Sequence, residues 1–216
     1  MGTNAPGEIA RLADIASPDV ALVTNIAPAH LEGLHSMEGV AREKGDLFRA
    51  LPDAGVAVVN ATDLRVVREA GRCRAEKVYY GVALNDFSGR ILSMTDSGMR
   101  ITVRTPAGEF SSSLGITGEH HLMNALAATA VAFTLGLRPQ DMEEGLASFS
   151  SVPGRFHARP LRGGGLLLDD SYNANPASTE AALRTLASLA RGRRTVVVFG
   201  DMLELGPYER GGHEMV

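Results

Sequence analysis

The sequence predicts an α/β protein made of two pieces that meet near residue 152. Three features predict this fold class. Short β-branched apolar runs alternate with helical stretches over residues 20–80, three runs of alternating apolar and polar residues follow over 90–114, and strand–helix alternation resumes after Val152-Pro153-Gly154. Parallel sheets covered by helices produce the first kind of pattern, and antiparallel strands with one wet face produce the second. We therefore expect a domain boundary between residues 1–152 and 153–216.

The first piece begins with segments typical of a parallel sheet. Residues 20–24 (VALVT) and 56–59 (VAVV) are short, apolar and rich in β-branched side chains, as buried strands are. The turn sequence Pro52-Asp53-Ala54-Gly55 precedes the second of them. Further elements are expected as helices at 34–51 and 63–70 and as a strand at 77–80.

The alternating runs predict a small antiparallel layer. Residues 90–94, 99–104 and 109–114 are separated by the turn sequences Asp96-Ser97-Gly98 and Pro106-Ala107-Gly108. An Ala-rich buried helix is expected next at 121–135, followed by an amphipathic helix at 140–149.

The second piece predicts a βαβ unit. Residues 166–168 are expected as a strand, 176–190 as a helix and 195–199 (TVVVF) as a buried strand, and this succession is typical of a parallel sheet. In such sheets, ligands bind beyond the carboxyl ends of the strands. Three segments have that position in the predicted fold: residues 25–30, 169–175 and 200–206.

Composition argues against several classes of function. Hydrophobic residues make up 44% and charged residues 21% of the chain, as in an ordinary globular protein. The net charge of -4, without clusters of Lys and Arg, predicts no nucleic-acid partner. No apolar run approaches the roughly 18 residues that span a bilayer, and residues 1–10 lack the features of a signal peptide. We therefore expect a cytoplasmic protein with no membrane partner, in which the single cysteine, Cys73, is an ordinary structural thiol.

Two residues of the first piece could carry chemistry, and each has an ordinary alternative. His30 follows a buried strand, where a neutral imidazole can bind a metal or orient a phosphate. A single histidine is more often an ordinary loop or core residue. Lys44 lies between Glu43 and Asp46 and resembles a solvated helix lysine.

The segment DDSYNAN at residues 169–175 is richer in polar groups. Asp169 and Asp170 end an apolar strand, where carboxylates can accept hydrogen bonds from ribose or bind Mg²⁺. Asn175 precedes Pro176 at the expected helix start and could be its N-cap. So many hydrogen-bonding side chains at one strand end favour a polar ligand.

Taken together, these segments resemble the Mur ligase family. The motifs are, in order, Gly7-Glu8-Ile9, NIAPAHLE (25–32), EGVAREK (38–44), GEHHLMNA (118–125), PGRF (153–156), DDSYNAN (169–175) and GDMLELG (200–206). The resemblance runs along the whole chain and is weakest in the hairpin region. The last two motifs are similar to those of the member that joins D-alanyl-D-alanine to the UDP-N-acetylmuramoyl tripeptide.

The resemblance implies part of a three-domain ligase. Residues 1–152 would be the second half of a P-loop-type central ATP-binding domain, and 153–216 the first part of a C-terminal Rossmann-like domain. The chain contains no GxxxxGK[ST] phosphate loop, which would then lie upstream. We therefore expect a fragment, inactive alone, of a monomeric enzyme of peptidoglycan precursor synthesis that uses ATP and Mg²⁺ and forms its amide bond through an acyl phosphate. The alternatives are another Mur ligase, a folylpolyglutamate synthase-like ligase, or a nucleotide-binding module without catalysis.

The same resemblance implies roles for individual residues. His30 would bind Mg²⁺, and Lys44 would do so as a carbamate, which replaces the lysine cation by an oxygen-bearing anion. The nucleotide would be bound at its adenine by Asn124, at its phosphates by Arg155 and at its ribose by Asp170. The incoming dipeptide would lie against Asn173 and Asn175.

One motif departs from the family pattern. Relatives usually have His-Asn where this chain has His120-His121. The change could affect nucleotide affinity or the local loop geometry, and His121 could take over the role of the missing Asn.

Overall fold

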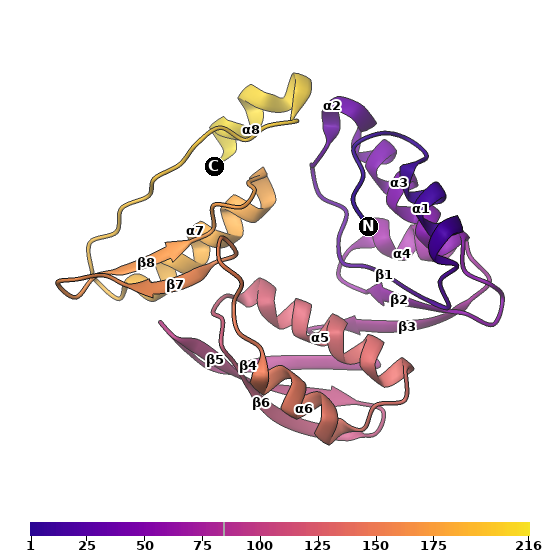
Figure 1. Ribbon diagram of the computed structural model, residues 1–216, viewed down its shortest axis with the longest axis horizontal. Helices are drawn as coiled ribbons and strands as arrows, with labels where there is room; N and C mark the ends of the chain where they lie inside the picture. The colour runs from indigo at the N-terminus through magenta and orange to yellow at the C-terminus, as the bar shows by residue number, and fades with distance from the viewer. Residues whose placement is uncertain (84) are drawn as a thin grey trace.

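A computed structural model of the chain describes residues 1–83 and 85–216 and contains a six-stranded sheet in the order β1-β2-β3-β4-β5-β6 (Figure 1). Neighbours are parallel from β1 to β4 and antiparallel from β4 to β6. The strands are β1 (Val20–Val23), β2 (Val56–Asn60), β3 (Glu76–Gly81), β4 (Phe87–Thr95), β5 (Gly98–Thr105) and β6 (Gly108–Leu114). The predicted antiparallel strands are confirmed, but they extend the main sheet and form no separate layer, because β4 pairs with both β3 and β5.

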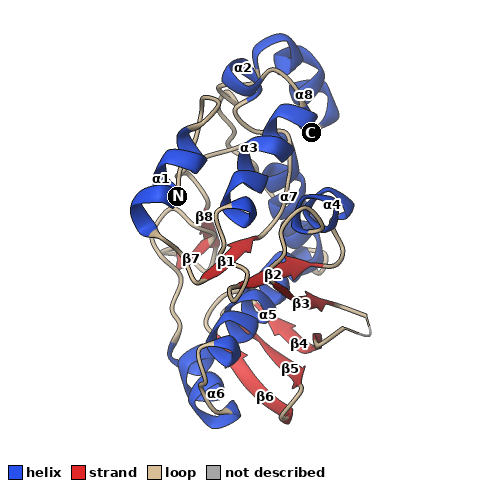
Figure 2. Cartoon of the chain, turned by 90° about the vertical axis from the view of Figure 1, so that its right-hand side faces the viewer, coloured by secondary structure: helices blue, strands red, loops and turns tan. Residues whose placement is uncertain are grey.

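Helices cover both faces of the sheet (Figure 2). One face carries α1 (Glu8–Ala16), α3 (Met37–Arg49) and α4 (Leu64–Ala70), and the other carries α5 (Glu119–Thr134) and α6 (Pro139–Ser148). Successive side chains of β2 point to opposite faces of the sheet and pack against different helices. Ala57 and Val59 belong to the apolar cluster that includes Phe48 of α3, whereas Val58 belongs to the cluster of α5. The helices predicted at 34–51, 63–70, 121–135 and 140–149 are confirmed as α3, α4, α5 and α6. Helix α1 was not expected from the sequence.

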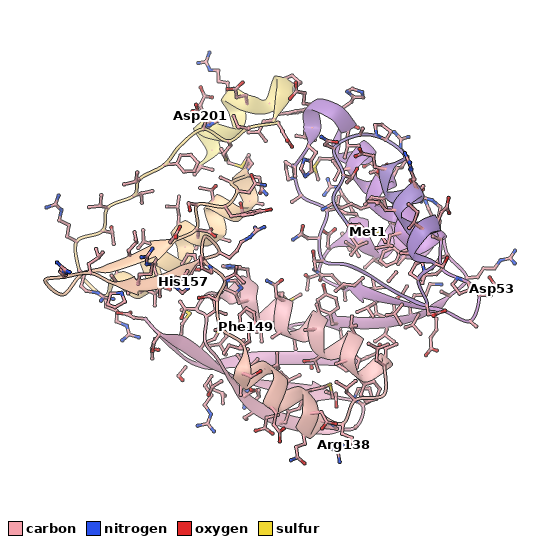
Figure 3. The ribbon with its side chains drawn as sticks, viewed as in Figure 1. Met1, Asp53, Arg138, Phe149, His157 and Asp201 are labelled. Carbon is pink, nitrogen blue, oxygen red and sulfur yellow. The ribbon has the colours of Figure 1, made fainter. Side chains whose placement is uncertain are left out.

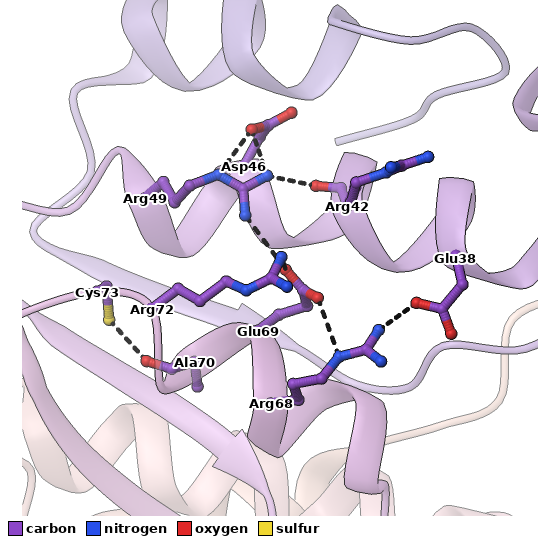
Figure 4. A network of polar contacts seen from close by, with 9 residues as sticks. All are labelled: Glu38, Arg42, Asp46, Arg49, Arg68, Glu69, Ala70, Arg72 and Cys73. Atoms are coloured by element: carbon purple, nitrogen blue, oxygen red, sulfur yellow. Dashed lines mark hydrogen bonds and ion pairs between the residues drawn. The ribbon is translucent and has the colours of Figure 1, made fainter.

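The contact between α3 and α4 contains a buried charge (Figure 4). Glu69 is fully buried, and its carboxylate oxygens lie 2.9 Å from Arg72 Nη1, 3.2 Å from Arg49 Nη1 and 3.4 Å from Arg68 Nε. Three guanidinium groups offset the cost of removing this carboxylate from water. The Cys73 thiol is also buried and donates a hydrogen bond to the Ala70 carbonyl at 3.2 Å, as expected for a structural cysteine.

Residues beyond 152 fold differently from the prediction. Strands β7 (His157–Pro160) and β8 (Leu166–Asp169) form an antiparallel hairpin, and α7 (Pro176–Ala190) packs against α5. The chain then runs without regular structure to η1 (Gly206–Tyr208), which contacts α2 (Leu31–Leu34), and ends in α8 (Glu209–Met215), as Figure 1 shows. The helix at 176–190 is confirmed.

The predicted strand at 195–199 is wrong, and with it the parallel βαβ unit. No described strand pairs with this segment, and Val198 is 96% exposed. A strand needs a neighbour for its backbone N–H and C=O groups, so an apolar β-branched run is not enough to form one. None of the described helices combines the length and the hydropathy that a membrane span requires.

Candidate functional site

A cavity of about 880 Å³ lies between the sheet and the second piece. It is bounded by the carboxyl ends of β1–β3, by α5 and α6, and by the loop that leads into α7. In Figure 3, Phe149 and His157 mark the two ends of the connection from α6 to β7, where Ser151 Oγ and His157 Nδ1 are 2.7 Å apart. Five of the predicted site residues line the cavity: Asn124, Arg155, Asp170, Asn173 and Asn175.

The cavity wall combines apolar and polar groups. Helices α5 and α6 contribute apolar groups such as Ala128, Met142 and Leu146. Polar groups come from the strand ends, from both helices, from the turn before β7 and from the loop before α7: Asn25, Asn60, His120, His121, Asn124, Asp141, Arg155, Asp170, Asn173 and Asn175. Sites of this kind take ligands that have both apolar surface and several hydrogen-bonding groups.

Side chains from three elements hold the backbone at the end of β1. The Thr24 carbonyl accepts hydrogen bonds from Asn60 Nδ2 at 2.8 Å and from the Tyr80 hydroxyl at 3.4 Å. The next peptide group is held on both sides, because Lys44 Nζ donates to the Asn25 carbonyl at 3.0 Å and the Ile26 N–H donates to Asp63 Oδ2 at 2.7 Å. Thr24 and Asn25 therefore enter the cavity wall in a fixed conformation.

The environment of Lys44 differs from that of a solvated helix lysine. Burial lowers the pKa of its amine, and the negative charge of Asp63 partly opposes this effect. Burial also raises the pKa of the Tyr80 hydroxyl, again with a contribution from Asp63. A lowered pKa increases the fraction of neutral amine, which is the form that reacts with CO₂.

His30 lies apart from the cavity lining. It is the N-cap residue of α2 with φ of 56°, and its Nδ1 is paired with the Glu204 carboxylate. The Glu32 N–H also donates to the Glu204 carbonyl at 3.2 Å. The segment 200–206, expected at the ligand site, therefore contacts the loop before α2, with none of its residues in the cavity wall.

The Mg²⁺ roles expected for His30 and Lys44 are not tested by the arrangement of side chains. Within the ranges 1–83 and 85–216, no three His, Cys, Asp or Glu side chains are grouped so that they could hold a metal. One nitrogen of His30 is already paired with Glu204. The roles of His30 and Lys44 as Mg²⁺ ligands therefore stay predictions, and no reaction step is derived through a metal.

His120 and His121 form a neutral pair at the cavity wall. Their ring centroids are 3.9 Å apart, and a side chain at Gly118, whose φ is 130°, would put its Cβ 2.8 Å from His120 Cε1. Burial lowers the pKa of His120, and Asp170 partly opposes this. Burial and the neighbouring His120 lower the pKa of His121 to about 3. His121 Nε2 is buried without a hydrogen-bond partner among the described residues.

The loop before α7 is organised by its own polar side chains. Asn175 is the N-cap of α7, with Oδ1 accepting from the Ser178 N–H at 3.0 Å, which confirms the ordinary alternative for this residue. Asn173 Oδ1 accepts from the Ala174 N–H at 2.9 Å. Asp170 Oδ1 accepts from the Phe156 N–H at 3.0 Å, which leaves its second oxygen for a ligand.

Sequence reasoning missed Asn60 and Tyr80 as cavity residues and Asp63 as the partner of Ile26. A signal for the first two was present, because both lie at carboxyl ends of predicted parallel strands. The contact of Asp63 with a residue 37 positions earlier in the chain had no local signal.

These features define a class of protein: an α/β protein whose parallel strands end at a polar ligand cavity that a second piece of the chain covers. The chain belongs to the Mur ligase family. The model of the Mur ligase middle domain matches residues 1–132, and that of the Mur ligase, glutamate ligase domain matches 154–216. The predicted family membership is thus confirmed.

Individual relatives give the same picture. The UDP-N-acetylmuramoyl-tripeptide–D-alanyl-D-alanine ligase of Escherichia coli (strain K12) is 39% identical over the whole chain, which covers 48% of that protein. A crystal structure of MurF from Acinetobacter baumannii has a TM-score of 0.89 at 30% identity, over 99% of this chain and 46% of the other. MurF ligase from Thermotoga maritima in complex with ADP has a TM-score of 0.84 at 28% identity, over 98% and 48%. The chain spans about half the length of the curated relatives it matches.

Proposed function

We propose that the chain is the nucleotide-facing half of an ATP-dependent ligase that joins D-alanyl-D-alanine to UDP-N-acetylmuramoyl-tripeptide. The observation that carries this proposal is the cavity, whose wall combines Asn124, Arg155 and Asp170 from both sides of residue 152. Support also comes from relatives that bear this ligase name and from one relative solved with ADP. We also infer that residues 1–152 and 153–216 belong to two domains, which is supported by the separate family matches.

The chemistry of such a ligase follows from the weakness of a carboxylate as an acyl donor. Transfer of the γ-phosphoryl group of ATP to the tripeptide carboxylate gives an acyl phosphate and ADP. The amine of the dipeptide then attacks the acyl carbon, and phosphate leaves from the tetrahedral intermediate as the C–N bond is kept and the amine proton is lost. The main contributions of the protein to such a reaction are to bind the reactants and to orient them for transfer.

The cavity residues have side chains suited to these tasks. Arg155 can bind phosphate oxygens through two parallel N–H groups. The free oxygen of Asp170 can accept a hydrogen bond from a ribose hydroxyl, and Asn124 can pair with the edge of adenine. Asn173 and Asn175 keep their amide N–H groups for the dipeptide, since their oxygens already accept backbone hydrogen bonds. His30 and a carbamate at Lys44 would add hard oxygen and nitrogen donors for Mg²⁺, a cation that usually offsets phosphate charge.

Phosphate release from a full-length ligase that contains this chain tests the proposal. The assay compares D-alanyl-D-alanine with single amino acids as acceptor, and Lys44→Ala with the unchanged enzyme. Release with the dipeptide alone, lost in Lys44→Ala and partly restored by a short carboxylic acid, supports the reaction and the carbamate. Release with another acceptor assigns a different ligase activity, and absence of release with every acceptor favours a binding module. The 216-residue chain alone is expected to release no phosphate, since it has no phosphate loop.

A further inference from the structure

Tyr172 is a large aromatic side chain that is 70% exposed beside the cavity. Its ring lies under the guanidinium of Arg155, with Arg155 Cζ 3.9 Å from the ring centroid. Arg155 lines the cavity and has no carboxylate within salt-bridge distance among the described residues. An arginine that lacks a counter-ion among the described residues and lies over an exposed ring at a ligand cavity is arranged for an anion from a ligand.

The backbone holds the two residues in register. The Tyr172 N–H donates to the Gly154 carbonyl at 3.1 Å, and the Phe156 N–H donates to Asp170 Oδ1 at 3.0 Å. Gly154 has φ of 77°, and a Cβ there would lie 3.4 Å from Tyr172 Cβ. These two hydrogen bonds join the turn before β7 to the loop after β8 on both sides of Arg155. Because the backbone is already held, contact with the Tyr172 ring serves to restrict the side chain of Arg155.

Stacking and anion binding use different parts of the guanidinium. The ring of Tyr172 covers one face of the group, whereas its N–H donors lie in the plane and point from its edge. An oxyanion can thus bind at the edge while the face stays on the tyrosine. Restricting a long flexible side chain before binding reduces the entropy lost when the ligand binds.

We propose that Tyr172 is a positioning residue that presents the edge of Arg155 to an oxyanion in the cavity. This inference rests on the proposed function, which supplies two sources of the oxyanion: a phosphate group of ATP and the carboxylate of the dipeptide. Tyr172 has no direct contact with the ligand in this role, and it acts through Arg155.

A double-mutant cycle on the full-length ligase tests the proposal. Binding is measured by calorimetry for the unchanged enzyme, Tyr172→Leu, Arg155→Ala and the double variant. The probes are ATP against adenosine, and D-alanyl-D-alanine against its C-terminal amide. Tyr172→Leu is expected to weaken the oxyanion-bearing probe about 2- to 5-fold, as an exposed cation–π pair would. The same substitution should have no effect in the Arg155→Ala background or on the probe that lacks the anion.

Two control variants separate positioning from folding. Tyr172→Phe keeps the ring and should bind within about 2-fold of the unchanged enzyme. Tyr208→Leu removes a half-exposed tyrosine of η1 outside the cavity and should leave affinity unchanged.

The outcomes are distinct. If the effect of Tyr172→Leu on ATP binding depends on Arg155, the anion is a phosphate group. If its effect on dipeptide binding depends on Arg155, the anion is the carboxylate. Both results support the proposal. Equal losses from Tyr172→Leu with and without Arg155, or equal losses for ATP and adenosine, overturn it while leaving the ligase assignment intact. An unchanged enzyme that binds neither ATP nor the dipeptide overturns the proposed function and this inference with it.

Discussion

The two pieces of the chain hold their strand-end loops in different ways. In the first piece, several polar contacts join distant residues: the Ile26 N–H donates to Asp63, and Glu43 of α3 accepts from the N–H groups of Gly7 and Ile9 at the start of α1. In the second piece, most side-chain contacts of the loop before α7 are local, such as Ser171 with Asp169 and Asn175 with Ser178, although Asp170 also accepts from the Phe156 N–H. The end of β1 therefore depends on residues far along the chain, whereas the loop before α7 depends mainly on residues within it and on the turn before β7.

The apolar residues differ in the same way. Phe48 of α3 is fully buried between α3 and the sheet, whereas Phe199 in the unpaired segment after α7 is 45% exposed. Substitutions in the first piece should therefore affect the whole fold, and those in the second should act locally.

The largest expected effect is at Phe48. Phe48→Ala should lower the free energy of unfolding by about 3–5 kcal/mol, because it removes a buried ring and leaves a cavity. Urea denaturation of the chain measures this value. A cost below about 1 kcal/mol would contradict the buried position of this ring.

Acid should destabilise the chain through His121, where the two pieces meet. The pKa of His121 is about 3 in the folded state and 6.5 in its ordinary state, so between these values the unfolded chain binds a proton that the folded chain does not. Stability is therefore complete above pH 6.5 and falls as the pH decreases, by up to about 1.4 kcal/mol per pH unit. His121→Gln should show a flatter dependence in urea titrations at pH 7, 6 and 5. Identical slopes for both proteins would argue against a buried, neutral His121.

Asp63→Ala tests the long-range contacts of the first piece. Asp63 caps α4 through the N–H groups of Arg65 and Val66 and also holds Ile26, so its removal should cost about 1–2 kcal/mol. Ser36→Ala is the matched control, because Ser36 caps α3 with one hydrogen bond to the Gly39 N–H. Equal losses of stability in the two variants would mean that the bond to Ile26 contributes nothing.

The smallest effect is expected at Phe199. Phe199→Ala should change stability by no more than about 0.5 kcal/mol, as substitutions at exposed positions do. A loss as large as that of Phe48→Ala would restore the buried strand that the sequence pattern predicted at 195–199.

How far the sequence predicts the fold depends on where the hydrogen-bonding partners lie. Strands β1, β2 and β3 follow from apolar runs because each finds its neighbour within the chain. Residues 195–199 have the same pattern but lack a described neighbour, and no local pattern reveals that. The start of α7 at Pro176 followed from Asn175, since capping is a local property.

In the candidate site too, residues within motifs were predicted, whereas their distant partners were not. Asn124, Arg155 and Asp170 were predicted through family motifs, and all three line one cavity. Ile26 and His30 have partners that the motifs did not reveal. These partners, Asp63 and Glu204, lie 37 and 174 residues away in the sequence, where spacing carries no information.

The peptide group between Asn25 and Ile26 has a consequence for observing the protein at work. Its carbonyl accepts from Lys44 while its N–H donates to Asp63, so the two bonds polarise each other. Any change in the chemical state of the lysine alters the electron density of that one amide. The NMR chemical shift of the Ile26 amide therefore reports on the chemical state of Lys44 in solution, without a probe molecule in the cavity.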